Sequence, residues 1–336
     1  MDQKPQTVAF ILEAGPGIGL GHVDRSGVLA RELQRRGHSV LAAVQGPRDV
    51  LPDRGWQALS HARQLQAETG EPTEAKVLDL ASETNPQWIC IDGYGFANDK
   101  FIRALKARGY RVLVFDDLDP NRLKGLADIV VNQNGSGGNE QSGLLNDTRY
   151  ALVSANLLAG RNRPATSWQG RILVSLGGAD PKNLTRPILR LLDQTLIPAC
   201  DIDVIIGPYF EDKGPFESPR HRLHIHDAPE TLTPFMLSAD LIVTAAGSSC
   251  WQACAAAIPM VAIETADNQR VVTRTLADAK AAVVLRGDDL AHAQTVFKDS
   301  ITRLVSDDTA RHTLSQAAAA LVDGQGAHRI ADAMGL

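Results

Sequence analysis

Short apolar runs alternate with amphipathic stretches along the first half of the chain. Consecutive apolar residues are typical of strands buried on both faces, and apolar residues at helical spacing indicate helices that cover a sheet. This alternation predicts a parallel sheet with helices on both faces. The predicted strands are 8–12, 39–44, 88–91, 111–115 and 129–131, and the predicted helices are 23–36, 73–83 and 99–108.

The same alternation restarts after residue 170. Strands are predicted at 172–175, 204–206, 223–226, 241–244, 261–263 and 282–285, and helices from about 182, near 229–237, 249–257, 268–279 and 289–306, and over the last ~30 residues. Residues 159–169 resemble a linker, and 135–146, rich in Gly, Ser and Asn, are expected to form a mobile loop, with 136–146 as a lid.

A chain of 336 residues suits two domains. We therefore expect an α/β protein of two Rossmann-like domains facing a cleft, with bounds 1–160 and 170–336. Ligands of such sheets bind at the carboxyl ends of the strands, so the loops found there are the places to look for chemistry.

Composition narrows the function classes. The net charge is −5 and no dense Lys or Arg block occurs, which argues against a nucleic-acid partner. No apolar run approaches the ~20 residues of a membrane span, and the first residues lack the pattern of a signal peptide. The four cysteines are expected to be buried reduced thiols, which favours the cytoplasm.

The glycine-rich stretch Gly17-Ile-Gly19-Leu-Gly21-His22-Val-Asp-Arg25 follows the first predicted strand and opens a helix. Glycines permit a tight turn close to a ligand, and the helix N-terminus attracts an anion. His22 on the first helical turn has a side chain suited to acid–base catalysis near neutral pH. The spacing is not that of a dinucleotide-binding or P-loop motif. An ordinary strand-to-helix turn is the alternative.

Two loops of the second half have similar features. Gly247-Ser248-Ser249 begins a helix whose free N–H groups suit a diphosphate, and Gln252 one turn later could bond ribose hydroxyls; a plain Ser N-cap is the alternative. Gly177-Gly178 precedes Asp180-Pro181, which would be the N-cap and first residue of a helix, so a structural turn is equally open there.

Acidic and histidine side chains also follow predicted strands. Asp92 and Asp117 could bind sugar hydroxyls or act as bases, although helix capping is an alternative for Asp117. The trio His221, His224 and His226 lies along one predicted strand. Without a fourth group at suitable spacing it is not expected to hold a metal.

Taken together these motifs resemble the UDP-2,4-diacetamido-2,4,6-trideoxy-β-L-altropyranose hydrolases of pseudaminic acid biosynthesis, which are similar to MurG-type GT-B glycosyltransferases. The resemblance covers nearly all of residues 7–286. The motifs that carry it, in order, are Ile18-Gly19-Leu20-Gly21-His22-Val23-x-Arg25, Asp92-x-Tyr94-Gly95, Phe115-Asp116-Asp117, Asn132-Gln133-Asn134, Ser175-Leu-Gly-Gly-x-Asp180-Pro-x-Asn183-Leu-Thr185, Ala246-Gly-Ser-Ser-Cys-Trp and Ala266-Asp-Asn-Gln269.

The resemblance implies roles for individual residues. His22 would be the catalytic histidine that assists water in cleaving the sugar–diphosphate bond with inversion, releasing UDP and a free sugar. No cofactor or metal is expected, the acceptor is water, and the oligomeric state is left open. For the sugar the resemblance implies Asp92, Tyr94, Asn268 and Gln269, and for the nucleotide Gly247, Ser248, Ser249 and Gln252. With the other loop residues included, the predicted substrate-binding residues are Gly19, Gly21, Arg25, Asp92, Tyr94, Asp117, Asn268 and Gln269, and the predicted nucleotide-binding residues are Gly177, Gly178, Gly247, Ser248, Ser249 and Gln252.

The sequence departs from this family at three positions. Gln252 stands where the family usually has Glu, and Ile11 and Glu13 stand where it usually has Arg and Asp. A neutral amide makes weaker hydrogen bonds to hydroxyls than a carboxylate, and loss of an arginine removes a planar donor fork. These changes concern the substrate rather than the fold, so a related nucleotide sugar is an alternative.

Three functions are therefore considered. The first is a nucleotide-sugar hydrolase, the second a GT-B glycosyltransferase that uses a UDP-sugar donor, and the third a non-catalytic binding protein. The intact His22 argues against the third, whereas Gln252 argues weakly for it.

Overall fold

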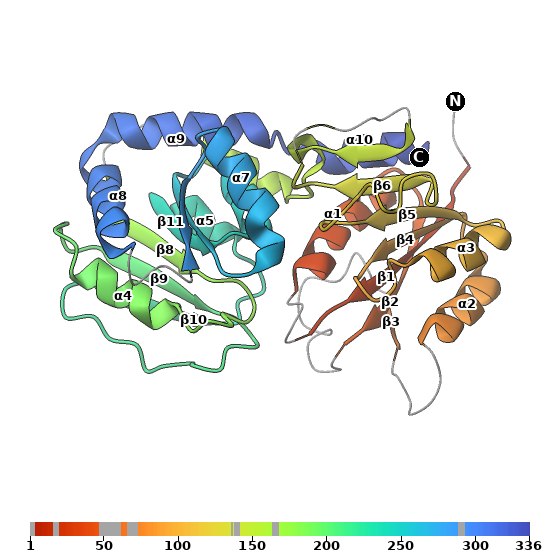
Figure 1. Cartoon of the computed structure of the whole chain (residues 1–336), viewed down its shortest axis with the longest axis horizontal. Coiled ribbons are helices and arrows are strands. Elements are labelled where there is room, and N and C mark those ends of the chain that lie inside the picture. Colours follow the sequence, from red (N-terminus) through yellow and green to blue (C-terminus); the bar gives the residue numbers. More distant parts are fainter. Residues whose placement is uncertain are drawn as a thin grey trace. The chain divides into compact units, whose positions relative to one another are not determined.

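The structure is a computed structural model that describes residues 4–15, 20–46, 62–65 (backbone only), 73–135, 137, 142–162, 168–287 and 293–336. It consists of two compact units (Figure 1). Unit 1 comprises Met1–Leu152 and Gln325–Leu336, and unit 2 comprises Val153–Gly324.

Unit 1 is a doubly wound sheet of seven parallel strands in the order β3-β2-β1-β4-β5-β6-β7. The chain therefore reverses its direction of travel across the sheet between β1 and β4, which pair directly. The elements are β1 (Thr7–Glu13), α1 (Gly21–Arg35), β2 (Ser39–Gln45), β3 (Ala62–Leu65), α2 (Thr73–Thr84), β4 (Trp88–Asp92), α3 (Asp99–Ala107), β5 (Arg111–Phe115), β6 (Ile129–Asn132), β7 (Leu144–Asn146), η4 (Thr148–Tyr150) and α10 (Gly326–Met334).

The core of unit 1 explains why its strands are uninterrupted apolar runs. Ile11 of β1 and Ile91 of β4 pack with Phe101 and Leu105 of α3 on one face of the sheet. Helix α1 contacts β1, β2 and β4 and buries Leu29. A central parallel strand that is covered by helices on both sides leaves no place for a polar side chain until the strand ends.

Unit 2 is a doubly wound sheet of six parallel strands in the order β10-β9-β8-β11-β12-β13. The elements are η5 (Ala155–Asn162), β8 (Arg171–Ser175), α4 (Thr185–Asp193), β9 (Asp201–Ile206), β10 (Arg222–Asp227), α5 (Thr233–Ser238), β11 (Leu241–Ala245), α6 (Ser248–Ala255), β12 (Met260–Glu264), η6 (Asp267–Gln269), α7 (Arg270–Asp278), β13 (Val283–Arg286), α8 (Gln294–Ser306) and α9 (Asp308–Leu321).

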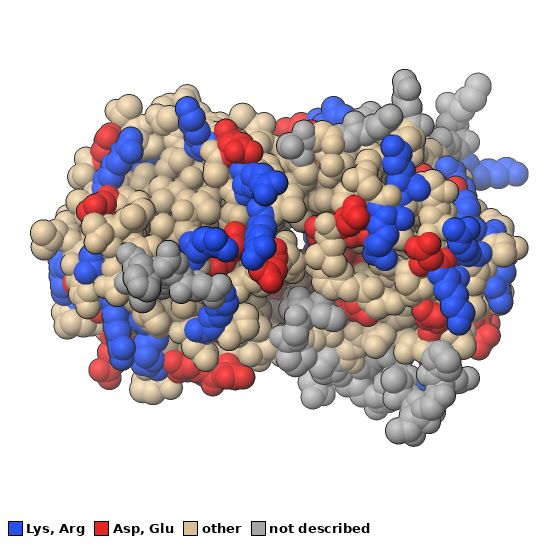
Figure 2. Space-filling view, in the orientation of Figure 1, with Lys and Arg blue, Asp and Glu red and all other residues tan. Residues whose placement is uncertain are grey.

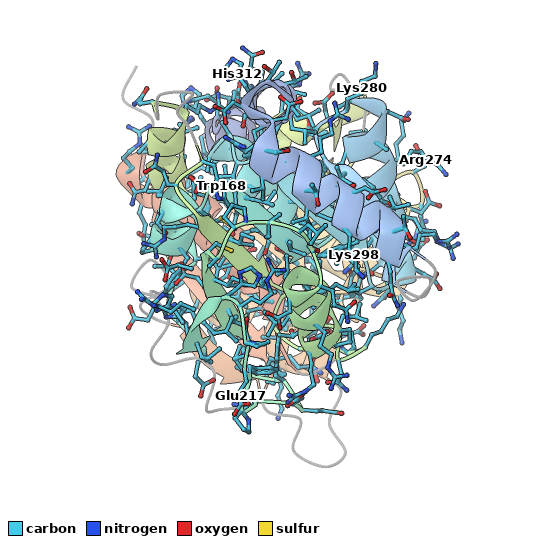
Figure 3. The ribbon with its side chains drawn as sticks, turned by 90° about the vertical axis from the view of Figure 1, so that its left-hand side faces the viewer. Trp168, Glu217, Arg274, Lys280, Lys298 and His312 are labelled. Atoms are coloured by element: carbon cyan, nitrogen blue, oxygen red, sulfur yellow. The ribbon has the colours of Figure 1, made fainter. Side chains whose placement is uncertain are left out.

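Helices α4 and α8 cover one face of this second sheet. Ile188 of α4 and Phe297 of α8 belong to the same buried cluster as Val174 of β8. At the surface, Lys298 of α8 donates a hydrogen bond to Gln194 at the end of α4 (2.9 Å), and Figure 3 shows the two helices on the side nearest the viewer. Helix α6 contacts β11 and β12 and is almost entirely buried.

The predicted fold class, α/β with two Rossmann-like domains, is confirmed by these two sheets, whose strand orders follow the doubly wound pattern. The predicted linker at 159–169 is not where the chain passes between units, because that point lies at 152–153. Arg161 of η5 explains the difference, since its Nε donates to the carbonyl of Ala255 (2.9 Å) inside unit 2.

The expected bound of 336 for the second domain is also wrong, because α10 belongs to unit 1. Arg36, which follows α1, donates to the backbone carbonyl of Leu336 and pairs with Asp332 (2.7 Å). Arg111 of β5 donates to the carbonyl of Met334 (3.2 Å). These contacts join the last helix to the helix that carries His22.

Two local predictions need correction. Residues 144–146 form β7, an edge strand paired with β6, where a mobile loop was expected. The lid interpretation also involves 136 and 138–141, which lie outside the described residues. Helix α4 begins at Thr185 and not near 182, because Asp180 and Asn183 adopt positive φ values of 41° and 50° that no helix admits.

Candidate functional site

The carboxyl edge of the first sheet gathers polar side chains from distant parts of the sequence. Strands β1 and β4 lie side by side, with Leu12 opposite Asp92, so Glu13 and Asp92 end at the same edge. The neighbouring β5 and β6 end at Phe115 and Asn132. Helix α1 starts above this edge at Gly21. This is the position where doubly wound sheets bind their ligands.

His22 is held there by Asp92. Its Nδ1 lies 2.9 Å from Oδ1 of the Asp92 carboxylate and 3.1 Å from the backbone oxygen of the same residue. Both partners are acceptors, so Nδ1 carries a proton. In the neutral ring the lone pair is consequently on Nε2. The Tyr94 ring packs against the imidazole in a T-shaped arrangement, with ring centroids 5.0 Å apart.

Arg25, one turn further along α1, clamps two carboxylates. Its Nε and Nη2 donate to the two oxygens of Asp92 (2.8 and 2.6 Å), and its Nη1 donates to Asp117 (2.6 Å). The Ser26 hydroxyl also donates to Asp92 (3.0 Å), and Asn134 donates to Asp117 (3.0 Å). Arg25 is 4% exposed and Asp92 is fully buried. The five side chains form one connected network, which we call the Arg25 network.

The Arg25 network sets the charge around His22. Burial by itself disfavours the ionised form of Asp92, but the adjacent Arg25 guanidinium and His22 hold the pKa of its carboxyl well below the usual range. Burial likewise opposes a charge on His22, yet the Asp92 carboxylate outweighs it and raises the pKa of the imidazole above its ordinary value. His22 is therefore a strengthened base.

Asp116 and Asp117, which follow β5, have different structural roles. Asp116 accepts hydrogen bonds from the backbone N–H groups of Leu118 and Asp119 (3.0 and 3.1 Å) and pairs with Arg122. Asp116 thus performs the turn-capping role that the sequence suggested for Asp117. Asp117 turns toward Arg25 instead and belongs to the site.

The predicted substrate-binding residues of unit 1 fall into three groups. Tyr94 is 37% exposed beside His22, which suits contact with a ligand. Arg25 and Asp92 are occupied by each other, so the structure gives them the role of orienting His22, and direct sugar contact stays a prediction. Gly21 is the first residue of α1, and Gly19 lies outside the described residues.

Ser26 and Asn134 lie in the site but were not among the predicted site residues, although Asn134 belongs to one of the motifs that carry the resemblance. A usable signal existed for both. Ser26 directly follows Arg25 on the same helix, and Asn134 follows β6, the strand next to β5, so both sit at the predicted carboxyl edge.

The corresponding edge of unit 2 presents backbone groups and hydroxyls. Helix α6 begins at Ser248 after Gly247, and no side chain caps it. Among the described residues, a Cβ built on Gly247 would meet nothing within 4 Å, so space lies open beside the first turn. Ser175 at the end of β8 lies opposite Thr244 of β11, and its buried Oγ has no hydrogen-bond partner among the described residues. Such an edge suits an anion.

The loop after β8 is built tightly around its glycines. Gly177 has φ of +83°, and a Cβ on Gly207 would collide with the carbonyls of Gly177 and Gly178. The Asp180 carboxylate accepts the N–H groups of Leu184 and Thr185 (2.9 Å each), which caps α4 from within the loop. Structural packing therefore accounts for much of this motif.

The loop after β12 is likewise self-bonded. The Gln269 side-chain oxygen accepts the backbone N–H of Thr265 (2.7 Å), whereas Asn268 is exposed on η6. Gln252 is half-buried one turn into α6. The sugar and ribose contacts expected of these residues stay predictions.

The histidine trio of unit 2 separates into structural pairs. His221 is buried, with its Nδ1 accepting the backbone N–H of Cys200 (3.3 Å). His224 pairs with Asp201 and His226 with Asp203, at 2.8 Å each. Among the residues that the structure describes, no group of three or more His, Cys, Asp or Glu side chains is arranged to hold a metal ion.

All four cysteines are buried and unbridged, as predicted. Burial raises the pKa of the Cys250 thiol to about 12, so it is not a nucleophile at neutral pH. On the face shown in Figure 2, basic and acidic side chains are interspersed rather than segregated. Within the described ranges, no helix combines the length and apolar character that a bilayer crossing requires.

Comparison with protein-family models gives no match. The spore coat polysaccharide biosynthesis protein SpsG of Bacillus subtilis is 24% identical over 337 residues, which cover 96% of this chain and 96% of SpsG. The uncharacterized protein MJ1062 of Methanocaldococcus jannaschii is 23% identical over 292 residues, 78% of this chain. The match spans 56% of that relative's length.

Solved structures match the whole chain. MurG of Acinetobacter baumannii is 17% identical with a TM-score of 0.67, covering 98% of this chain and 99% of MurG. The spinosyn rhamnosyltransferase SpnG in complex with thymidine diphosphate is 16% identical, TM-score 0.65, over 96% and 99%. The UDP-GlcNAc 2-epimerase of Neisseria meningitidis bound to UDP-GlcNAc is 11% identical, TM-score 0.65, over 98% and 99%. The chain has the GT-B fold.

Proposed function

We propose that this protein is an enzyme that takes a nucleoside-diphosphate sugar and transfers its glycosyl group, with His22 as the base. The observation that carries the proposal is the buried His22–Asp92 pair at the carboxyl edge of the first sheet. A proton on Nδ1, held by a carboxylate that Arg25 keeps ionised, leaves Nε2 to take a proton from the acceptor.

The reaction needs little other chemistry from the protein. As Nε2 removes the acceptor proton, the acceptor oxygen bonds to the anomeric carbon. The bond from that carbon to the diphosphate oxygen breaks, and the nucleoside diphosphate leaves with the electron pair. General base catalysis of this kind contributes about 10²–10⁴-fold in rate.

The proposal assigns the nucleotide to unit 2. Gly247, Ser248 and Ser249 open helix α6, whose N–H groups suit a diphosphate. Among the described residues no side chain caps this helix, and the Ser175 hydroxyl at the same edge has no hydrogen-bond partner. Two structures of the same fold were solved with thymidine diphosphate and with UDP-GlcNAc, which supports a nucleotide-binding role here.

The proposal has two versions, which differ in the molecule that accepts the glycosyl group. SpnG is a glycosyltransferase and SpsG belongs to polysaccharide biosynthesis, so the comparisons favour transfer to a hydroxyl of a saccharide or another acceptor molecule. The sequence motifs resemble a UDP-sugar hydrolase, which favours water. We take glycosyl transfer as the main proposal, and hydrolysis of a UDP-activated diacetamido-trideoxyhexose as the second.

The deciding experiment measures nucleoside-diphosphate release from UDP- and dTDP-sugars, including UDP-2,4-diacetamido-2,4,6-trideoxy-β-L-altropyranose, with no acceptor present. Rapid release with free sugar as the product identifies a hydrolase. Slow release that a saccharide acceptor accelerates identifies a transferase. Nucleotide binding without turnover in either condition would contradict both versions.

A further inference from the structure

Glu13 lies across the turn that carries Tyr94. It is the last residue of β1 and is 7% exposed. Its two carboxylate oxygens accept the backbone N–H of Gly95, at 3.2 Å each. A Cβ built on Gly93 would lie 2.6 Å from Cγ of Glu13, and one on Gly95 would approach its Oε1 more closely still. Both neighbours of Tyr94 must therefore be glycine while Glu13 occupies this place.

The Gly93–Gly95 turn is also held by a hydrogen bond from Asn98. The Asn98 side chain donates to the carbonyl of Gly95 (3.0 Å) and to Glu74 (2.9 Å), while its own oxygen caps α3 at Phe101. Gly95 thus has both backbone groups bonded to side chains. Little freedom remains at this peptide, so Tyr94 projects from a rigid base toward the His22 ring, 5.0 Å away and at 77°.

We propose that Glu13 is a positioning residue for the base: by holding the Gly93–Gly95 turn it keeps the Tyr94 ring against the imidazole of His22. The similar family usually has Asp at this position. The Glu side chain is one methylene longer, and in this structure it reaches the N–H of Gly95. The side chain acts through its size and its acceptor oxygen, and contact with substrate is not required. The inference rests on the proposed function, since it takes His22 as the base.

The first readout does not depend on turnover. A ring proton of His22 is shifted by the aromatic current of Tyr94, and its NMR resonance is identified among the nine histidines by its loss in His22→Gln. Tyr94→Leu gives the position without the ring. We expect Glu13→Ala to move the resonance to the Tyr94→Leu position and Glu13→Gln, which keeps an acceptor for Gly95, to restore the wild-type position.

Two glycine variants form a matched pair. In Gly95→Ala the added Cβ displaces the Glu13 carboxylate, so the His22 resonance should move as in Glu13→Ala. In Gly27→Ala the Cβ meets nothing nearer than Nη1 of Arg31 at 3.9 Å, so the resonance should stay. An unchanged resonance in both Glu13→Ala and Gly95→Ala would overturn the inference, and circular dichroism checks that each variant is folded.

Turnover provides the second readout. For Glu13→Ala we expect kcat to fall about tenfold with KM for the nucleotide sugar within about twofold, and Glu13→Gln to restore kcat to within about twofold of wild type. Equal loss in both variants would mean that the carboxylate acts by its charge, which contradicts the positioning role. A wild-type protein without turnover refutes the proposed function, while the resonance still decides the role of Glu13.

Discussion

The carboxyl edges of the two sheets occupy the same place in the same kind of fold but are built from different groups. In unit 1 the edge holds charged side chains that are buried and bonded to one another, as in Arg25 with Asp92. In unit 2 the part of the edge formed by β8 and β11 presents the Ser175 hydroxyl and the backbone N–H groups that open α6, half-buried at Gly247 and Ser248. A general base needs surroundings that shift its pKa and fix its orientation, whereas a diphosphate needs available hydrogen-bond donors. Each edge therefore suits one half of a glycosyl transfer.

Removing the base from unit 1 is the sharpest test of this division. His22→Asn should lower kcat about 10³-fold, because general base catalysis of about this size is lost, while the affinity for nucleoside diphosphate stays within about threefold. Steady-state kinetics and calorimetric titration measure the two quantities. A parallel loss of nucleoside-diphosphate affinity would mean that His22 binds the nucleotide. Catalysis and nucleotide binding would then not belong to separate edges.

Arginine pairs of the two units provide the second test. Arg25→Met leaves Asp92 and Asp117 buried without their cation, which should cost about 3–5 kcal/mol of unfolding free energy. Arg186→Met in unit 2 also breaks a two-point pair with an aspartate, but Arg186 and Asp212 lie in solvent, where an ion pair stabilises little, so a much smaller loss is expected. Urea unfolding measures both, and similar losses would show that burial does not distinguish the pairs.

Glycine variants of unit 2 separate binding from folding. Gly247→Ala adds a methyl group to open space at the start of α6, so thermal stability should be kept while nucleotide affinity falls about tenfold. Gly207→Ala drives its Cβ into the carbonyls of Gly177 and Gly178, and it should lower the melting temperature. Unchanged nucleotide affinity in folded Gly247→Ala would mean that the diphosphate does not bind at the N-terminus of α6.

The smallest expected effect is a shift of a pH profile. In the proposed mechanism the base is neutral His22. Burial lowers the pKa of His22, but Asp92 and Asp117 raise it by more than burial and Arg25 lower it, so the acid limb of kcat should lie above the ordinary histidine pKa. Asp117→Asn removes one of these carboxylates and should move the limb to lower pH. A limb that stays or moves upward would contradict this electrostatic account.

The same shift predicts how stability depends on pH. Since the folded pKa of His22 lies above 6.5, its stabilising contribution is complete below the unfolded pKa and is lost as pH rises through the folded value. His22→Asn should remove that decline, which unfolding curves across this window would reveal.

Strands with continuous apolar runs, such as β1 and β4, could be predicted from the sequence, and so could the loops that end them. Strand β3 could not, because Ala62-Arg63-Gln64-Leu65 has no such run and is recruited by pairing with β2. Arg25, Asp92 and Asp117 were each predicted as site residues, but the hydrogen bonds that join them in the Arg25 network could not be predicted. Arg25 is 67 residues from Asp92 and 92 from Asp117, and nothing local to Asp92 requires an acid. Only the adjacency of β1, β4 and β5 brings them together.

Unit 2 is inserted into unit 1, since residues 325–336 return to pack on α1. During synthesis the ribosome must finish all of unit 2 before α10 emerges. Helix α1, which bears His22 and Arg25, therefore cannot pack against α10 until unit 2 has been synthesised. Unit 2 can fold before that contact forms. A nascent chain stalled before residue 325 would hold a folded unit 2 and a unit 1 that still lacks α10.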